Sequence, residues 1–238
     1  MSKTKKKLFI ITGVAGLLGS TLLPSILLKK NSMVVGIDNL KLGKIKFIKK
    51  FLNKKNFFFL KADLHKRINS SKFRQILARH QLEEIWHLAA NSDISSGIKD
   101  YRIDYRDTFL STFNILNFLR PFLNLNSKVI FASTSAIYGN LGKKIHEKSA
   151  PLMPESNYGS MKLASEAYIS SYSFLNKVRS FIFRFPNVVG TNLTHGVIYD
   201  LSKKILSNKK YLNVLGNGNQ CKPYSSVDEI IRCIMYLI

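Results

Sequence analysis

The chain has 238 residues, of which 37 are Lys or Arg and 14 are Asp or Glu, so its formal net charge at pH 7 is +23. This length and a hydrophobic fraction of 45% indicate one domain, or a domain with an added lobe, that buries a substantial core. The two cysteines, Cys221 and Cys233, lack the spacing of metal ligands, which excludes a cysteine-based metal site. They predict free thiols in a reducing compartment, hence a cytoplasmic protein without a bound metal.

The positive charge raises the question of a nucleic-acid partner. Of the 37 basic residues 28 are lysines, spread over most of the chain and accompanied by abundant isoleucine and asparagine. This profile is typical of an AT-rich coding sequence, so we expect no specific nucleic-acid partner. A basic surface would still attract anionic substrates through long-range electrostatics.

The first chemical motif follows an apolar run over Leu8–Ile11, which predicts a buried strand. Glycines then recur as G-x-x-G-x-x-G at Gly13, Gly16 and Gly19, ahead of a helix predicted over about Leu17–Lys29. Gly13 suits the tight strand-to-helix turn, Gly16 leaves the backbone open to a phosphate, and Gly19 lets the helix pack closely. The pattern predicts a dinucleotide whose pyrophosphate faces the free N–H groups of the helix start.

The same stretch has an alternative interpretation. Four lysines, at positions 3, 5, 6 and 7, precede the apolar run and resemble the start of a secretory signal peptide. Glycines in register and a matching strand–helix–strand unit downstream argue against it. Thr12, the three glycines and Pro24 interrupt the run too often for a membrane span, so we expect none.

The second predicted strand, over 33–37, ends at Asp38, 19 residues after Gly19. An acid there can accept hydrogen bonds from the adenosine ribose hydroxyls and would repel a 2′-phosphate, which favours NAD over NADP. The alternative is a turn residue, because Asp-Asn is a common turn pair. A short helix is predicted over 43–55.

Two further strands contribute candidate cofactor contacts. After the strand predicted over 56–60, Asp63 and Leu64 follow, and Asp63 could approach the adenine amino group. Alternatively it caps the helix predicted over 65–81. The strand over 84–88 runs into Ala89 and Ala90, whose small side chains let the backbone pass close to a dinucleotide. His87 on that strand is expected to be a core residue.

The remaining elements continue the alternation of strands and helices. We predict a polar loop over 91–106, a helix over 108–122, a strand over 128–132, a loop over 140–157, a helix over 158–176 and a strand over 180–185. This order predicts an α/β fold with a doubly wound parallel sheet of the Rossmann type, with ligands at the carboxyl ends of its strands.

A tyrosine and a lysine form a Y-x-x-x-K pair at Tyr158 and Lys162. Residues four apart lie on one helix face. A neighbouring ammonium and the positive charge of an oxidised nicotinamide both favour the phenolate, so we expect a lowered tyrosine pKa and a usable base. Tyr199 and Lys203 match the pattern as well, and about one match is expected by chance. Position favours the first pair, since Thr134 at the Ser/Thr-rich end of the fifth strand could reach the same substrate hydroxyl.

Taken together, these motifs resemble an extended short-chain dehydrogenase/reductase of the NAD-dependent epimerase/dehydratase family, which acts on nucleotide sugars. The resemblance covers nearly the whole chain, in family order. The motifs that carry it are Thr12–Gly19, Asp38, His87–Ala90, Ser133–Thr134 with Ile137–Gly139, Tyr158 and Lys162 with Ser165–Glu166, and Arg184–Gly190.

The resemblance implies a role for each site residue. Tyr158 would be the base that removes a sugar hydroxyl proton, Thr134 would hydrogen-bond that hydroxyl, and Lys162 would hold the nicotinamide ribose. Asn187 would hold the substrate, and Lys222 stands where the family commonly has Arg, which keeps the charge and loses the two-pronged geometry. The implied NAD contacts are Gly13, Gly16, Leu17, Gly19, Asp38, Asp63, Leu64, Ala89, Ala90, Tyr158, Lys162 and Phe185, and the substrate contacts are Thr134, Ser135, Asn187 and Lys222.

Two departures from the family pattern refine this expectation. The sugar 4,6-dehydratases follow the threonine with an Asp-Glu pair, whereas this chain has Ser135 and Ala136, which disfavours dehydration. The chain stops within a helix that begins near Val227, where family members continue. We therefore expect an NAD-binding domain over 1–186 and an incomplete, truncated substrate lobe over 187–238.

The sequence predicts an NAD-dependent nucleotide-sugar epimerase that inverts C4 of a UDP- or GDP-linked sugar through a ketosugar. One alternative is an oxidoreductase of the same family, a ketosugar reductase or a dehydrogenase. Another is a non-catalytic NAD-binding module. The resemblance also implies a role in surface polysaccharide synthesis and a homodimer formed through the helices over 108–122 and 158–176.

Overall fold

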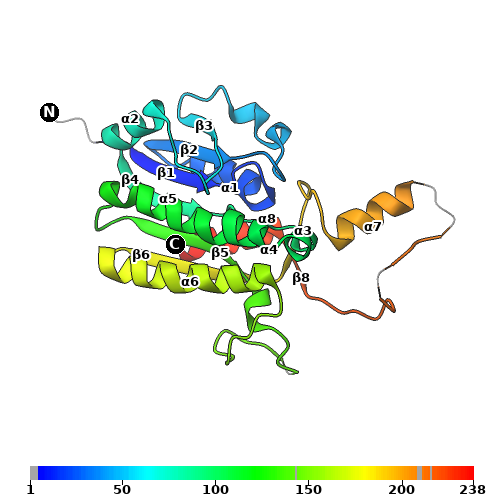
Figure 1. Ribbon diagram of the computed structural model, residues 1–238. Coiled ribbons are helices and arrows are strands. Elements are labelled where there is room, and N and C mark those ends of the chain that lie inside the picture. The colour runs from blue at the N-terminus through cyan, green and yellow to red at the C-terminus, as the bar shows by residue number, and fades with distance from the viewer. Residues whose placement is uncertain (1–4, 143, 208–210, 215) are drawn as a thin grey trace.

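The computed structural model describes residues 5–142, 144–207, 211–214 and 216–238. Its centre is a sheet of six parallel strands in the order β3-β2-β1-β4-β5-β6 (Figure 1). The order reverses between β1 and β4, and such a switch point opens a crevice at the carboxyl ends of the strands. This confirms the predicted doubly wound sheet. The strands are β1 Lys7–Thr12, β2 Ser32–Asp38, β3 Phe57–Lys61, β4 Gln81–His87, β5 Lys128–Thr134 and β6 Arg179–Phe185.

Helices cover both faces of the sheet because successive strand residues point to opposite sides. On one face α2 Ser71–Arg79, α5 Ser111–Leu119 and α6 Asn157–Asn176 pack over a core that includes Leu8 and Ile10 of β1. On the other face α1 Leu17–Leu27 and α8 Val227–Leu237 pack over Phe9 and Ile11. The first strand is therefore buried on both sides, as its unbroken apolar run predicts.

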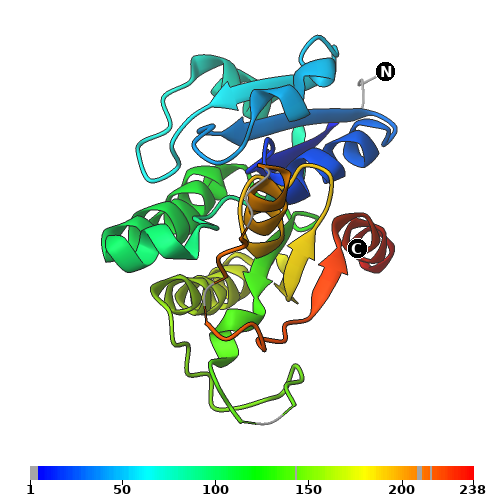
Figure 2. The ribbon, with the colours of Figure 1, turned by 90° about the vertical axis from the view of Figure 1, so that its right-hand side faces the viewer.

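A smaller parallel pair, β7 Asn187–Val189 and β8 Tyr224–Ser226, follows the main sheet. Between these strands the chain forms α7 Val197–Leu206, which projects away from the sheet and has no buried residue (Figures 1 and 2). After β8 the chain returns to the sheet, and α8 packs beside α1.

The region predicted as a polar loop over 91–106 is helical. It forms α3 Ile94–Lys99 and α4 Tyr101–Asp104, and a π-helical segment Tyr105–Leu110 then leads into α5. Each short helix is capped by an acid, since Asp93 accepts from Ser95 N and Asp100 accepts from Arg102 N. Polar capping residues stabilise helix starts while making a sequence look like a loop, which is why the prediction was wrong.

Three of the predicted helices also differ from the structure in their bounds or their continuity. The helix expected over 65–81 begins at Ser71, because the Ser70 hydroxyl caps it, and Gln81 already belongs to β4. Asp63 therefore does not cap this helix. The stretch over 43–55 forms two 3-10 turns rather than one helix, and the helix predicted over 108–122 is divided into the π-helical segment, α5 and a final 3-10 turn.

Within the described ranges, the helices are all too short or too polar to cross a lipid bilayer.

Candidate active site

The glycine-rich turn lies at the carboxyl end of β1, beside the switch point. Gly13 has a φ of +68°, and a Cβ there would lie 2.9 Å from the backbone nitrogen of Ala89, two residues after the end of β4. A Cβ at Gly19 would overlap the carbonyl oxygen of Gly13, so the helix can pack against the turn only without a side chain there. Gly16 caps α1 with no side chain over the free N–H groups. The turn therefore provides an uncovered helix start that fits a pyrophosphate.

The backbone next to this turn is held by a buried polar network. The Thr12 hydroxyl accepts hydrogen bonds from Leu88 N and Ala89 N at 3.1 Å each and lies 2.8 Å from His87 Nδ1. His87 Nε2 lies 2.9 Å from the Thr112 hydroxyl. Burial lowers the pKa of His87 to about 3, so the ring is neutral. His87 is a core residue, as expected, and it fixes the segment that contains Ala89 and Ala90.

Asp38 ends β2 next to the same turn. Its carboxylate accepts hydrogen bonds from Ala15 N at 2.9 Å and from Leu40 N at 2.8 Å, and its residue is 8% exposed. Burial raises the pKa of Asp38, and the two backbone hydrogen bonds oppose that rise. An anionic acceptor thus lies beside the glycine-rich turn, where a ribose hydroxyl could reach it.

Asp63 lies at the edge of the crevice after β3. It accepts a hydrogen bond from Asn39 Nδ2 at 2.6 Å and lies 3.5 Å from Lys41 Nζ. Burial acts to raise the pKa of Asp63, but the bond from Asn39 and the charge of Lys41 outweigh it and lower that pKa. The carboxylate is therefore ionised and already bound to the β2–β3 connection.

Thr134, Tyr158 and Lys162 meet at the carboxyl end of β5. Thr134 ends the strand, and its side chain lies close enough to the Tyr158 phenol, in the first turn of α6, to lower the pKa of that phenol. The Lys162 ammonium lies 5.9 Å from the Tyr158 ring centre and donates to the Ala132 carbonyl at 2.5 Å. Residues 24 positions apart are brought together because the Ser156 hydroxyl caps α6 at this point.

The pKa of Tyr158 differs from the sequence prediction. Burial raises the pKa of Tyr158 to about 12, against the Thr134 side chain, which lowers it. Burial also lowers the pKa of Lys162 to about 7, while the charge of Glu166 opposes that fall. The predicted lowering is wrong for the chain's own groups, since desolvation dominates and Lys162 carries only part of a positive charge at neutral pH.

An ion pair that the sequence analysis assigned no role lies beneath these residues. The Glu166 carboxylate accepts three hydrogen bonds from Arg184, two from Nε at 3.1 and 3.2 Å and one from Nη2 at 2.7 Å, and a short one from the Ser133 hydroxyl. Arg184 also donates to the Tyr138 hydroxyl at 2.9 Å. The Glu166 side chain is 7% exposed, and the pair connects α6 to β5 and β6 one helical turn after Lys162.

The predicted substrate residues lie on the neighbouring segments. Phe185 is the register partner of Thr134 across β5 and β6, and Ser135 begins the 3-10 turn after β5. Asn187 begins β7 and donates to the Pro223 carbonyl at 3.2 Å, which brings it next to the exposed Lys222. Leu64 is buried against the helix layer of α2 and α5. Leu17 opens α1 directly after the glycine-rich turn.

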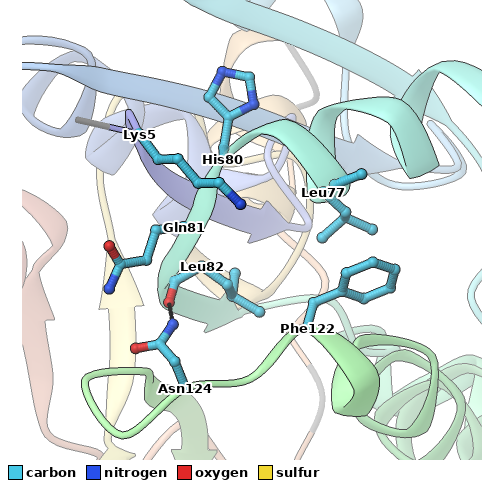
Figure 3. Close-up of a pocket in the computed structure, with 8 residues that line it drawn as sticks. Lys5, Leu77, His80, Gln81, Leu82, Phe122 and Asn124 are labelled. Carbon is cyan, nitrogen blue, oxygen red and sulfur yellow. Dashed lines mark hydrogen bonds between the residues drawn. The ribbon is translucent and has the colours of Figure 1, made fainter. Parts of the chain in front are cut away.

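A separate pocket of about 360 Å³ lies at the opposite edge of the sheet, where β4 begins (Figure 3). Lys5, His80 and Gln81 line it with Leu82 and Asn124, and Asn124 Nδ2 is already bonded to the Leu82 carbonyl at 2.7 Å. It lies at the amino ends of the strands, away from the crevice, so it is not the candidate site. Over the described residues, no cluster of His, Cys, Asp and Glu is suited to a metal ion.

The sequence matches a family described as the NAD dependent epimerase/dehydratase family over residues 9–238. A putative UDP-glucose 4-epimerase of Methanocaldococcus jannaschii is 28% identical over 230 residues, which cover 94% of this chain and 71% of that relative. Human dTDP-D-glucose 4,6-dehydratase is 22% identical over 235 residues, which cover 98% of this chain and 65% of that relative. A solved structure is also similar: the crystal structure of UDP-glucuronic acid 4-epimerase from Bacillus cereus in complex with UDP-glucuronic acid and NAD. Its sequence is 25% identical and its TM-score is 0.83, and the match covers 97% of this chain and 72% of that chain.

Proposed function

Because the chain belongs to the NAD-dependent epimerase/dehydratase family, we propose that it is a nucleotide-sugar 4-epimerase that oxidises the sugar C4 hydroxyl to a ketone and reduces it again. The observation that carries this proposal is the meeting of Thr134, Tyr158 and Lys162 at the carboxyl end of β5. Ser135 and Ala136 follow Thr134 and have no carboxylate for an acid–base dehydration step. Epimerisation needs one proton-transfer group, and the site has it.

The cofactor in this proposal is NAD, whose nicotinamide would take and return the hydride. Gly13, Gly16 and Gly19 would form the pyrophosphate cradle together with the backbone of Leu17. Asp38 would bind the adenosine ribose and exclude a 2′-phosphate. The remaining proposed contacts are Asp63, Leu64, Ala89, Ala90, Tyr158, Lys162 and Phe185.

The proton steps belong to Tyr158. Thr134 lies near the phenol and acts to lower its pKa, so a substrate hydroxyl in the crevice would be within reach of both side chains. With its pKa at about 12, the phenol is protonated at neutral pH and suited to return a proton to the ketone oxygen. To act as the base, it needs nearby positive charge, which the protonated form of Lys162 supplies.

The substrate in this proposal is a sugar linked to a UDP or GDP group. Asn187 donates to the carbonyl of Pro223, the residue after Lys222, and Ser135 directly follows Thr134. An amide and an ammonium suit the oxygens of a diphosphate or a sugar. The M. jannaschii relative and the B. cereus structure, which are named as UDP-sugar 4-epimerases, support a UDP-linked substrate.

The test is turnover of UDP- and GDP-hexoses and UDP-hexuronates with NAD by purified protein, followed by separation of the sugar products. We expect conversion to the C4 epimer with no net change in NADH. Tyr158→Phe should reduce the rate by about 10²-fold or more. The matched control is Tyr199→Phe, which alters the second Y-x-x-x-K pair on the projecting α7 and should leave the rate unchanged.

Other outcomes would identify the alternatives. Stoichiometric NADH formation or consumption would indicate an oxidoreductase in place of an epimerase. NAD binding measured by calorimetry, without turnover of any sugar and without dependence on Tyr158, would indicate a non-catalytic NAD-binding module and would contradict the proposal.

A further inference from the structure

The Lys162 ammonium is a buried charge without a carboxylate in contact with it. Lys162 is 2% exposed, and it is the one lysine among the described residues that is buried. Its nitrogen donates to the Ala132 carbonyl at 2.5 Å, which uses one of its three N–H donors. Over the described ranges Lys162 forms no ion pair, and the one acid of α6, Glu166, is bonded to Arg184. Burying a cation in this way is costly unless another group stabilises it.

An aromatic ring lies where a carboxylate partner would be expected. The Lys162 nitrogen lies 4.6 Å from the centre of the Phe131 ring, compared with 5.9 Å from the centre of the Tyr158 ring. A cation–π interaction extends to about 6 Å from the ring centre, so the closer and stronger contact is with Phe131. Such an interaction is strongest where water is excluded, and Phe131 is fully buried. The Phe131 ring therefore stabilises the charged form of Lys162.

The Phe131 ring is itself held by the neighbouring strand. Phe131 is the register partner of His87 across β5 and β4, and the two rings stack with their centres 5.8 Å apart and their planes 15° apart. His87 is fixed by the hydroxyls of Thr12 and Thr112, at 2.8 and 2.9 Å. Because the imidazole is neutral, it places no second positive charge beside Lys162. The buried network next to the glycine-rich turn thus extends to the ring that contacts the lysine.

We propose that Phe131 is a positioning residue, whose ring face holds the Lys162 ammonium beside Tyr158 and keeps it charged. Three titratable groups surround the ammonium, namely Glu166 and Tyr158 from α6 and His87 from β4. Glu166 favours the charged form of the lysine, while Tyr158 and His87 are both uncharged at neutral pH. The inference rests on the proposed function, in which the charge of Lys162 allows Tyr158 to act as the base.

The direction of the effect follows from the charge distribution of the ring. The face of an aromatic ring is negative and favours an ammonium over a neutral amine, so loss of the ring lowers the pKa of Lys162. In Phe131→Leu we expect that pKa to fall by about 0.5 to 1 pH unit from its value of about 7, the order that one cation–π interaction produces. The protonated fraction of Lys162 at pH 7 then falls from about a half to roughly a quarter or less, and turnover at that pH should fall about 2- to 5-fold.

The first experiment follows Lys162 itself and does not depend on a substrate. The full chain is labelled with [ε-13C]lysine, the Lys162 resonance is assigned by its loss in Lys162→Met, and its chemical shift is followed from mildly acidic to alkaline pH. In Phe131→Leu the neutral amine should form at lower pH than in the wild type. Phe73→Leu is the matched control, because Phe73 is also fully buried in the core on that face of the sheet, stacks on Phe118 and should leave the titration unchanged.

A second variant separates the charge distribution of the ring from its volume. Pentafluorophenylalanine in place of Phe131 keeps an aromatic ring and reverses its charge distribution, so the pKa of Lys162 should fall at least as far as in Phe131→Leu. This variant leaves no cavity, so it decides the test where the two variants disagree or where Phe131→Leu does not fold. A fluorinated chain whose Lys162 titrates as in the wild type would overturn the inference.

The sugar assay adds a test of the role in turnover. The loss of turnover in Phe131→Leu should be small at mildly acidic pH, where Lys162 is protonated in both chains, and largest above pH 7. An equal loss at every pH would show a purely structural role of Phe131 and also overturn the inference. A shifted lysine titration without turnover in any variant leaves the inference on Phe131 and the charge of Lys162 standing and contradicts the proposed function instead.

Discussion

Two helices of this protein present the same pair of residues at the same spacing, and their surroundings differ completely. On α6 the Lys162 ammonium lies 5.9 Å from the Tyr158 ring, and on α7 the Lys203 ammonium lies 5.2 Å from the Tyr199 ring. Lys162 is 2% exposed beneath the end of β5, whereas α7 has no buried residue. Spacing therefore brings the two side chains together, and burial beside a strand end shifts the pKa values of one pair, Tyr158 and Lys162.

The largest expected effect concerns the acid on α6. Glu166→Gln leaves the partly exposed Arg184 guanidinium without its charged partner, and the loss should cost about 3 kcal/mol, the low end for a buried ion pair because only the acid is buried. Asp200→Asn, which neutralises an exposed acid next to Tyr199 on α7, should change the free energy of unfolding by less than about 0.5 kcal/mol. Urea unfolding of both variants provides the measurement. Equal changes in the free energy of unfolding would mean that the Glu166–Arg184 ion pair does not stabilise the fold.

The next prediction concerns the two lysines. Lys162→Met removes the cation beside the phenol and should reduce turnover by about 10²-fold, while Lys203→Met should leave it unchanged. The sugar-product assay measures both rates. A comparable loss in the two variants would contradict the assignment of α6 as the reactive helix.

A smaller effect is expected at the glycines that precede the helices. Gly13→Ala should weaken NAD binding and lower stability by about 1 to 3 kcal/mol, because its φ is positive and its Cβ would approach Ala89 N. Gly196, ahead of α7, also has a positive φ, but a Cβ there would meet no atom of the described residues within 4 Å, so Gly196→Ala is expected to introduce backbone strain alone. Calorimetric NAD titration of both variants provides the measurement. An equal weakening of NAD binding in Gly196→Ala would contradict a specific role of Gly13 at the cofactor site.

The smallest effect is a pH dependence of stability. The pKa of Lys162 is about 7 in the folded chain, below the ordinary 10.5, so above pH 7 the unfolded chain binds more protons and stability rises with pH. The rise should amount to about 1 kcal/mol over the first pH unit above 7. It should be absent from Lys162→Met and present in Lys203→Met. If the difference in unfolding free energy between the wild type and Lys162→Met stays constant with pH, Lys162 is not desolvated in the folded chain.

Much of this architecture could be predicted from the sequence because its signals are local. The apolar run before Gly13, the spacing of the glycines and the period of four at Tyr158 each lie within one element. Position along the chain predicted that Tyr158, and not Tyr199, lies beside a strand end, and the structure has this arrangement.

What could not be predicted depends on contacts between distant elements. The acid at Asp104 stood in a stretch that looked like a loop, and its burial follows from the missing side chain at Gly97 and the amide of Asn91. The sign of the Tyr158 pKa shift was wrong because i and i+4 spacing shows which side chains meet but not how far they are removed from water. The partners of Glu166 on β5 and β6 are likewise set by strand pairing.

The position of β1 has a consequence for how the protein forms during synthesis. β1 is made first yet lies in the middle of the sheet, paired with β2 on one edge and with β4 on the other. Roughly 70 residues must follow it before the second edge can be covered, and the run Leu8–Ile11 is fully apolar. An open apolar strand edge is a template for association with other chains, so the nascent protein depends on rapid arrival of β4.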